Sequence, residues 1–299
     1  MVYAIDASVY IFRAWFSMPD TMVDDNNDPV NAMYGFTRFI GDFLESANPD
    51  LVAVAFDQSL GSCFRNDIYP EYKANRDPAP IELKRQFLRC QQVVSALGLA
   101  DFSEARFEAD DLIGTVITRM RANGVAGTIV SCDKDMVQLL RDGDVMWDYA
   151  GNRRVGYHDV PAQYGVRPEQ MIDYLALAGD AVDNIPGVRG VGPKTASALL
   201  AHFDSLDSLY ADLGSVAQLS FRGAKTMAGK LEEHREKAYL SRELSTIHCD
   251  VPVNTSVAVL KRRAPDLGTL HHLYDQAGFG TALRHQAERI ADKFDVSRL

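Results

Sequence analysis

Acidic residues follow three short apolar runs of this chain, and each run is typical of a buried β-strand. They are Asp6, Asp57 and Asp133, which follow the runs 2–5, 51–56 and 128–132. Ligand sites of open α/β sheets form outside the carboxyl ends of the strands. We therefore expect the three carboxylates to meet at one edge of a sheet. Hard divalent cations prefer oxygen ligands, so the chemistry predicted at this edge is metal binding.

A second group of acids stands at the start of a predicted helix, 109–122. Glu108, Asp110 and Asp111 fall within four residues of one another. Acids in a first helical turn also stabilise a helix without any ligand, because they oppose its macrodipole and cap free amide groups. That structural explanation suffices for one or two acids. Three acids this close repel one another unless a cation holds them, which favours a metal site.

Two further pairs of aspartates complete the set. Asp133 and Asp135 flank Lys134 after a strand, where a helix N-cap accounts for only one of them. Asp180 and Asp183 are three residues apart and would lie on one face if their turn is helical. The candidate metal ligands are therefore Asp6, Asp57, Glu108, Asp110, Asp111, Asp133, Asp135, Asp180 and Asp183.

The elements that must position these acids alternate along the first half of the chain. Strands are predicted at 2–6, 51–56, 127–132 and 144–148, and helices at 31–46, 81–97, 109–122 and 134–140. This βαβ pattern predicts an α/β fold whose mostly parallel central sheet is covered by helices on both faces.

Beyond about residue 160 the strand signals fade, and short helical patterns separated by Gly and Pro follow. They cover 168–178, 193–202, 206–212, 223–229 and 232–244. We therefore expect an α/β core over 1–160 and a helical subdomain over 161–299, whose last helices return to the core.

Composition narrows the class of protein. A chain of 299 residues that is 46% hydrophobic can bury a large core. No stretch approaches the ~18 apolar residues of a membrane span, and no basic segment precedes an apolar one at the N-terminus, so we expect a cytoplasmic protein without membrane contact. The four cysteines form no C-x-x-C pair, which argues against a zinc site or a disulfide framework. A monomer is the default expectation.

The formal charge of −10 would ordinarily count against nucleic acid as a ligand, because DNA affinity comes from Lys and Arg on phosphates. The distribution of charge matters more. Residues 184–203 contain two basic residues and no acid, and 221–242 contain six basic residues and three glutamates. Without the nine proposed metal ligands the formal charge is close to zero, so a DNA substrate stays compatible with the composition.

The Gly-rich run that follows Asp183 is similar to a phosphate-binding P-loop, but the match fails in detail. Pro193 separates Gly192 from Lys194 and Thr195, and no strand precedes the loop as that motif requires. The run instead suits a hairpin between two short helices over 184–203, with Pro193 in the first turn of the second helix. The free N–H groups of such a helix start bind a phosphate oxygen without reading any base.

Taken together, the motifs carry a family resemblance. The chain resembles the 5′-nuclease domain of bacterial DNA polymerase I and, more broadly, the flap endonuclease family. The resemblance runs from Val2 to about Leu283 and rests on Ile5-Asp6-Ala-Ser, Ala55-Phe-Asp57, Phe64-Arg65, Tyr72-Lys-x-x-Arg76, Glu108-Ala-Asp-Asp111, Asp133-Lys-Asp135, Gly179-Asp-x-x-Asp-Asn-Ile-Pro-Gly187 and Ser220-Phe-Arg-Gly-Ala-Lys225. It implies a PIN-like nuclease core, a helical arch at 63–97 and a C-terminal helix-three-turn-helix subdomain.

The resemblance also implies a metal-dependent nuclease that acts on 5′ ends and branched DNA and leaves a 5′-phosphate and a 3′-hydroxyl. It places one Mg²⁺ or Mn²⁺ among Asp6, Asp57, Glu108 and Asp110, and a second near Asp133, Asp135, Asp180 and Asp183. Asp111 would serve both ions. Two ions about 4 Å apart can clamp the attacking and leaving oxygens of a phosphodiester. The family often carries a potassium ion in the hairpin.

The same resemblance assigns the basic residues of the arch and of the helical subdomain. Lys73 and Arg76 would approach the scissile phosphate, and Arg65 would hold a neighbouring phosphate. Tyr72 would either stack on an unpaired base or pack the base of the arch. Lys84, Arg85 and Arg89 are either phosphate contacts or a solvated helix face. Duplex phosphates would be bound by Arg189, Gly190, Gly192, Lys194, Thr195, Lys225 and Lys230.

Two other classes of protein are weaker candidates. A non-catalytic DNA-binding relative would have no reason to gather so many mutually repelling carboxylates. A phosphatase of the haloacid-dehalogenase type needs an Asp two residues after the first one, and Ser8 stands there. The sequence stops about where the polymerase proteins continue into proofreading and synthesis domains, so we expect a functional link to a separate polymerase. The seven histidines are interpreted as structural or surface residues.

Overall fold

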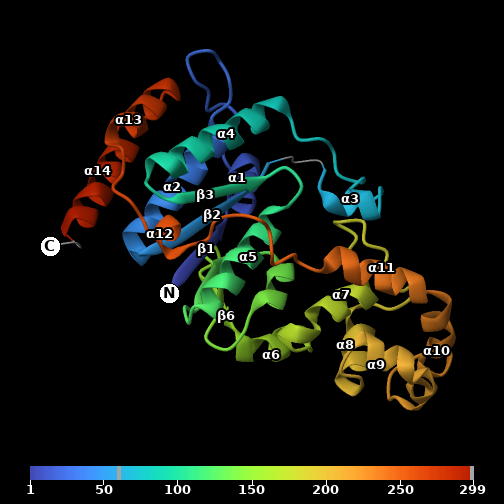
Figure 1. Ribbon diagram of the computed structural model, residues 1–299. Helices are drawn as coiled ribbons and strands as arrows, with labels where there is room; N and C mark the ends of the chain where they lie inside the picture. The colour runs from blue at the N-terminus through green and yellow to red at the C-terminus, as the bar shows by residue number, and fades with distance from the viewer. Residues whose placement is uncertain (59–61, 297–299) are drawn as a thin grey trace.

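The computed structural model describes residues 1–58 and 62–296. Its strands are β1 (Val2–Asp6), β2 (Leu51–Asp57), β3 (Ala100–Glu104), β4 (Gly127–Val130), β5 (Val145–Asp148) and β6 (Arg153–Gly156). Within these described residues they form one sheet in the order β3-β2-β1-β4-β5-β6 (Figure 1). Neighbours from β3 to β5 are parallel, and β6 pairs antiparallel with β5. The predicted α/β fold with a mostly parallel sheet is confirmed.

The two faces of the sheet pack against different helices because side chains alternate along each strand. Val52, Val54 and Phe56 of β2 join one hydrophobic cluster, and Ala53 and Ala55 join the other. The first cluster includes α1 (Ala7–Ser17), α2 (Asn31–Ala47), α4 (Ile81–Ala96), α13 (Leu267–Gln276) and α14 (Thr281–Val296), which cover that face (Figure 1). The second includes α5 (Ala109–Ala122) and the 3₁₀ helix η1 (Lys134–Leu139).

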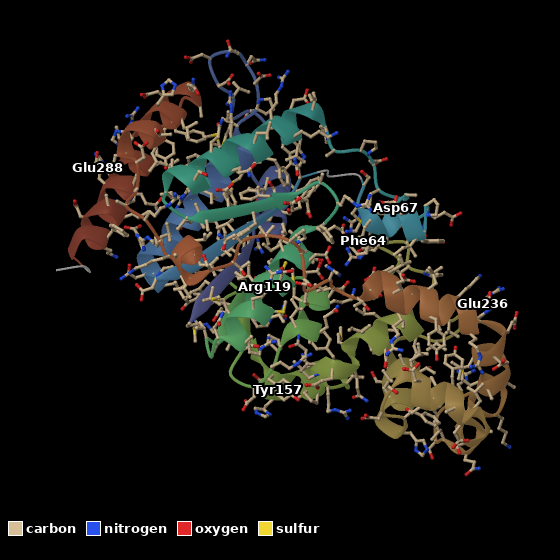
Figure 2. The ribbon with its side chains drawn as sticks, viewed as in Figure 1. Phe64, Asp67, Arg119, Tyr157, Glu236 and Glu288 are labelled. Atoms are coloured by element: carbon tan, nitrogen blue, oxygen red, sulfur yellow. The ribbon has the colours of Figure 1, made fainter. Side chains whose placement is uncertain are left out.

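A helical region extends from the sheet toward the lower right of Figure 1, and Glu236 marks its outer end in Figure 2. It comprises α6 (Val160–Tyr164), α7 (Met171–Ala178), α8 (Pro193–His202), α9 (Leu206–Ala211), α10 (Ala224–Glu233) and α11 (Arg235–Ser245), joined by the 3₁₀ turns η2 (Tyr157–Asp159), η3 (Pro168–Gln170) and η4 (Leu213–Gln218). The short α12 (Val257–Leu260) then leads back to α13. The apolar side chains of this region continue the α5-side cluster, so both parts share one core.

Among the elements that the sequence analysis did not predict, β3, β6 and α1 escaped it for local reasons. β3 is an edge strand with two acidic residues and a serine among its five positions, and β6 begins with two arginines, so neither shows an apolar run. α1 starts directly after β1 with Asp6 as its N-cap, which leaves no turn signal between them. In the part of the chain that is described, no helix is both long and apolar enough to cross a bilayer.

The stretch 63–97, for which a helical arch was predicted, is only partly helical. This stretch contains the one-turn helix α3 (Phe64–Ile68), a turn region from 69 to 77, and α4. Figure 2 places α3, with Phe64 and Asp67, between the sheet and the helical region. Leu83, Phe87 and Val94 of α4 are buried, so α4 packs in the core. Its apolar face explains this placement, because it needs the sheet-side helices to cover it.

Candidate active site

The ends of β1 and β2 place two buried carboxylates at the carboxyl edge of the sheet. Asp6 is 2% exposed, and its Oδ2 accepts a hydrogen bond from the Ser131 hydroxyl at 3.1 Å. Asp57 accepts one from the backbone N–H of Ala109, the first residue of α5, at 2.8 Å. β1 lies between β2 and β4, where the strand order reverses, and such a switch point is the usual ligand crevice of an open α/β sheet.

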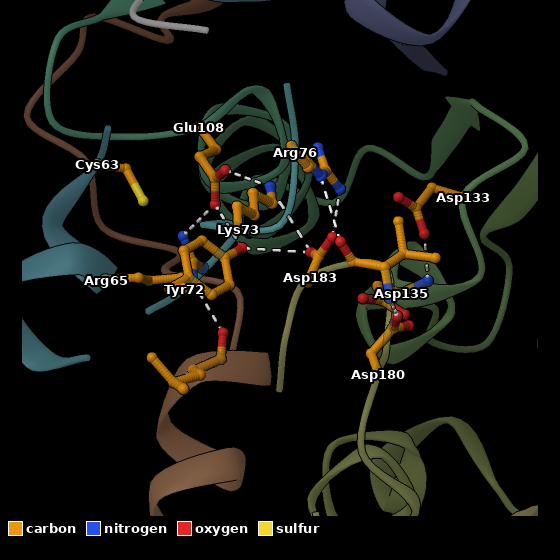
Figure 3. Close-up of polar contacts among 12 residues, drawn as sticks. Cys63, Arg65, Tyr72, Lys73, Arg76, Glu108, Asp133, Asp135, Asp180 and Asp183 are labelled. Atoms are coloured by element: carbon orange, nitrogen blue, oxygen red, sulfur yellow. Dashed lines mark hydrogen bonds and ion pairs between the residues drawn. The ribbon is translucent and has the colours of Figure 1, made fainter. Parts of the chain in front are cut away.

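Two basic residues of the turn region bind the acids at the start of α5 and in the loop after α7. The Lys73 ammonium contacts Glu108 Oε1 and lies 3.6 Å from Asp183 Oδ2. Arg76 pairs with the other oxygen of Asp183, and the Tyr72 hydroxyl donates to Glu108 Oε2 at 3.0 Å (Figure 3). Glu108 and Asp183 are therefore joined through Lys73.

A second group of acids surrounds Lys134. Its ammonium binds Asp180 Oδ2 and lies 3.8 Å from Asp135 Oδ1. Asp133 Oδ1 accepts the backbone N–H of Asp135 at 2.9 Å, as a cap of η1 (Figure 3). Asp135 Oδ1 is buried and has no hydrogen-bond partner. A buried carboxylate oxygen without a partner is costly and commonly marks the place of a ligand.

The loop after α7 is a closed turn, which corrects the helical geometry expected for Asp180 and Asp183. The backbone of Asp180 exchanges two hydrogen bonds with Ile185, at 3.0 and 2.8 Å. Gly179 and Gly187 close the loop in the left-handed region, with φ of 72° and 60°, and a Cβ on Gly187 would lie 2.4 Å from the Gly179 nitrogen. The two acids therefore bind different cations instead of sharing one helical face.

Asp111 is saturated with contacts from the protein itself. It is fully buried, and each of its carboxylate oxygens accepts two hydrogen bonds. Oδ1 accepts from Arg65 and from the His248 N–H, both at 2.8 Å, and Oδ2 accepts from Arg65 at 2.9 Å and the Glu108 N–H at 3.0 Å. These contacts give Asp111 a structural role in the metal-free protein, and its role as a catalytic residue and shared ligand stays a prediction.

The guanidinium of Arg65 is likewise fully hydrogen-bonded within the protein. Its side chain is 3% exposed and donates to Asp111, to Glu108 at 2.9 Å, and to the backbone carbonyls of Leu244 and Thr246, each at 2.9 Å. No part of the guanidinium is left for a phosphate. Arg65 joins the start of α5 to the end of α11, so it connects the sheet edge to the helical region.

For Tyr72, Arg85 and Arg89, the contacts support the structural interpretation and not a contact with DNA. Tyr72 is 4% exposed and packs at the base of the turn region, so it offers no free ring for a base. Arg85 pairs with Asp28 at 3.3 Å, and Arg89 pairs with Asp24 at 3.3 Å. Both arginines therefore belong to a solvated face of α4. Lys84 differs, because it is exposed and lines the cavity described next.

A cavity of about 870 Å³ adjoins Glu108 and Asp57. Lys73, Arg76 and Lys84 line it, together with three aromatic residues of α1, which are Phe12, Trp15 and Phe16. Phe16 is 81% exposed, which is unusual for so large an apolar side chain. The sequence analysis missed this aromatic wall. Its only local signal is the spacing of residues 12, 15 and 16, which share one face of any helix that contains them.

Burial and mutual repulsion shift the pKa values of the acids at this edge. Burial, with the Asp57 charge, raises the pKa of Asp6 to about 7, and burial, with the Asp133 charge, raises that of Asp135 to about 7. Burial and Asp133 also raise the pKa of Asp110. Burial acts the same way on Glu108, but Lys73 and Arg65 outweigh it and hold the pKa of Glu108 below its ordinary value.

These pKa shifts predict how the stability of metal-free protein depends on pH. A carboxyl whose pKa is raised from 3.8 to about 7 binds its proton more tightly in the folded chain, so stability falls as pH rises from about 4 to about 7 and then levels off. We expect a loss of about 2–4 kcal/mol, measured by urea unfolding with a chelator between about pH 5 and pH 8. The variant Asp6→Asn should lose less stability over the same pH range. A urea unfolding midpoint that is the same or higher at the upper pH than at the lower pH would contradict the prediction.

The candidate metal ligands have oxygen donors, which suit hard divalent cations. In their present positions, however, the side chains could not hold an ion. Within the described residues, no three His, Cys, Asp or Glu side chains converge on one point in a coordinating arrangement. The reason is visible in Figure 3, where the cations of Lys73, Arg76 and Arg65 contact the acids. The acids are all oxygen donors, one buried oxygen of Asp135 is unpartnered, and burial together with mutual repulsion raises the pKa of Asp6 and of Asp135. The nine ligands stay a prediction.

A basic surface lies on the helical region, around the start of α8. Gly192 is the N-cap and Pro193 the first residue of α8, as the sequence predicted. Gly190 has φ of 86°, and a Cβ there would lie 3.2 Å from the ammonium of Lys230 on α10. The exposed cations of this surface, which we call the α8–α10 patch, are Arg189, Lys194, Lys225 and Lys230. No carboxylate of the described residues forms an ion pair with them.

Family comparisons agree with this architecture. A family model described as 5′-3′ exonuclease, N-terminal resolvase-like domain, matches residues 1–165, and one described as 5′-3′ exonuclease, C-terminal SAM fold, matches 166–268. A 5′-3′ exonuclease of Buchnera aphidicola is 35% identical over 254 residues, which cover 85% of this chain and 88% of that protein.

DNA polymerase I of Pseudomonas aeruginosa is 38% identical over 276 residues, which cover 92% of this chain and 30% of that protein. The chain thus spans about a third of the length of its polymerase relatives. Among solved structures, phage T5 5′-exonuclease with bound zinc has a TM-score of 0.66 at 20% identity and covers 97% of this chain and 98% of its own. The catalytic core of Rad2 with a DNA substrate has a TM-score of 0.63 at 17% identity, covering 97% and 91%. These two likenesses concern the fold.

Proposed function

The chain belongs to the 5′-3′ exonuclease family, and from that premise we propose that it hydrolyses DNA phosphodiesters at 5′ ends and 5′ flaps with two divalent metal ions. The observation that carries the proposal is the sheet edge. There, buried carboxylates with raised pKa values lie beside the cations Lys73 and Arg76 and an open cavity. Buried carboxylates beside basic side chains suit a negatively charged substrate that binds together with metal cations.

Two sets of acids would hold the metal ions. The first set is Asp6, Asp57, Glu108 and Asp110, and the second is Asp133, Asp135, Asp180 and Asp183. Solved structures of the T5 exonuclease include one with bound zinc, which supports a divalent ion in this fold. The all-oxygen donors favour Mg²⁺ or Mn²⁺ here. Ions bound there would stabilise the negative charge that develops on the phosphodiester during hydrolysis. Potassium in the hairpin 184–203 is a further proposal from the family resemblance.

Lys73 and Arg76 would provide the phosphate contacts at the scissile bond. In the structure they pair with Glu108 and Asp183, and both line the cavity. Once the acids are neutralised by other cations, these side chains are free to turn to a phosphate without losing charge pairing. Phe12, Trp15 and Phe16 also line the cavity, and an unpaired base of the 5′ strand would find apolar surface there.

Duplex DNA would bind the α8–α10 patch. The Rad2 core, which shares the fold, has been solved with a DNA substrate. Exposed cations and the free N–H groups at the start of α8 are suited to phosphate oxygens and not to base edges. A monomeric state, a cytoplasmic location and a link to a separate DNA polymerase stay predictions.

A charge-removing variant tests the α8–α10 patch. Lys194→Ala is expected to weaken the binding of unrelated duplex sequences equally and to lower the slope of log affinity against log salt by about one. Fluorescence anisotropy at several KCl concentrations measures both quantities. Lys261→Ala is a matched control, because Lys261 is exposed beside Leu51, at the end of β2 opposite to Asp57. A loss confined to one sequence, or an unchanged slope, would rule the phosphate contact out.

The proposed function is tested by incubating the protein with a 5′-labelled flap duplex and Mg²⁺. A chelator and a blunt duplex serve as controls, and the product ends are analysed for phosphate. We expect cleavage near the branch, loss of cleavage with chelator, and 5′-phosphate products. Binding of the flap without any cleavage would mean that the chain is a non-catalytic DNA-binding relative.

A further inference from the structure

Lys134 stands among the second set of acids, where its positive charge opposes the binding of a metal ion. It lies between two candidate ligands in sequence, Asp133 and Asp135, at the start of η1. Its ammonium binds Asp180 Oδ2 and stands 3.8 Å from Asp135 Oδ1, the buried oxygen that has no hydrogen-bond partner. The cation therefore lies beside the oxygens that the second ion would need.

Lys134 differs in its surroundings from Lys73 and Arg76, the cations that bind Glu108 and Asp183. Lys73 and Arg76 line the cavity and are positioned to reach a phosphate there. Lys134 is absent from the cavity lining, and its ammonium is bonded to Asp180 on the helical region. Charge compensation of Asp180 and Asp135 is the role that its contacts support.

The side chain is free enough to give way to an ion. Lys134 is 45% exposed, whereas Asp180 and Asp135 are 8% and 16% exposed. A long, half-exposed lysine can move its ammonium into water, but the short acids cannot leave the site. Entry of a divalent ion would therefore displace Lys134 and keep the carboxylates in place.

We propose that Lys134 is an internal counter-cation of the second metal site, which holds Asp180 in the metal-free protein and competes with the second ion. This inference rests on the proposed two-metal function. Lys134 is a positioning residue and touches no reacting atom. It sets the concentration of divalent metal at which the second site fills, and it keeps the acidic edge stable before any metal arrives.

The test compares Mn²⁺ binding by the full chain and by Lys134→Met, which keeps the length of the side chain and removes its charge. Free Mn²⁺ is measured by electron paramagnetic resonance during titration, without DNA. We expect the dissociation constant of the second ion to fall at least tenfold in Lys134→Met, and that of the first ion to change little. Lys134→Arg should stay near wild type, and Lys261→Met is the control for losing a surface lysine.

A second readout uses stability in place of binding. In chelator, Lys134→Met should unfold at a lower temperature than wild type, because the acids lose their compensating charge. Saturating Mg²⁺ should then raise its melting temperature by more than it raises that of wild type, since tighter binding to the folded state adds stability.

Each remaining outcome would overturn the inference. A second dissociation constant that is unchanged or higher in Lys134→Met, with normal binding of the first ion, would mean that Lys134 only braces Asp180, and the proposed function would survive. Loss of tight second-site binding in both Lys134→Met and Lys134→Arg would mean the same. Absence of saturable Mn²⁺ binding in wild type and variant would remove both the inference and the two-metal proposal.

Discussion

Replacing Asp135 with asparagine is expected to lower the rate of flap cleavage on the order of 10²- to 10³-fold, while DNA binding persists. Asparagine keeps the size of the side chain but removes the charge of a carboxylate whose Oδ1 is buried and unpartnered. Loss of one preorganised charge at a reacting centre has effects of this size. The α8–α10 patch lies on other elements, so affinity for duplex DNA should stay unchanged.

Single-turnover cleavage and fluorescence anisotropy on the same flap duplex measure the two effects separately. Asp142→Asn is the matched control, because Asp142 follows η1 closely but is 84% exposed and contacts only His158. In chelator, Asp135→Asn should also be more stable than wild type at about pH 8, since the raised pKa of Asp135 reflects repulsion by Asp133 as well as burial. Cleavage within a few-fold of wild type would exclude Asp135 from the catalytic site.

Arg65→Met is expected to destabilise the fold by about 3–5 kcal/mol, the usual result of removing one partner of a buried ion pair. Arg65 is the sole side-chain cation bonded to Asp111 among the described residues, and both side chains are almost completely buried, at 3% and 0% exposed. The variant leaves a carboxylate in the core without charge compensation. It also releases the carbonyls of Leu244 and Thr246, so the joint between α5 and the end of α11 should loosen first.

Urea unfolding measures this loss against Arg106→Met. Arg106 pairs with Asp67 at 2.7 Å, but both are about two-thirds exposed, at 68% and 66%, so its variant should cost less than about 1 kcal/mol. Combining Arg65→Met with Asp111→Leu should recover part of the stability, because no buried charge then remains. Equal effects of Arg65→Met and Arg106→Met would mean that Arg65 is not the structural residue its contacts indicate.

The sequence by itself determined the fold class and the set of acids at the sheet edge. The helices predicted at 109–122 and 193–202 are α5 and α8 to the residue, and the runs before Asp6 and Asp57 are β1 and β2. Periodicity, caps and Pro or Gly signals act within a few residues, so a single chain displays them. The carboxyl ends of parallel strands share one edge, which places Asp6 and Asp57 together without further information.

Only the tertiary structure decided what each charged side chain does. Arg65 and Arg76 look alike in sequence as phosphate ligands, yet one is 3% exposed and bonded to Asp111, and the other is 47% exposed beside the cavity. Likewise, Lys134 meets Asp180 across 46 positions of the chain. Burial and long-range pairing depend on which segments fold against one another, and no local pattern encodes them. Whether an acid binds a metal ion or a neighbouring arginine is therefore decided by packing.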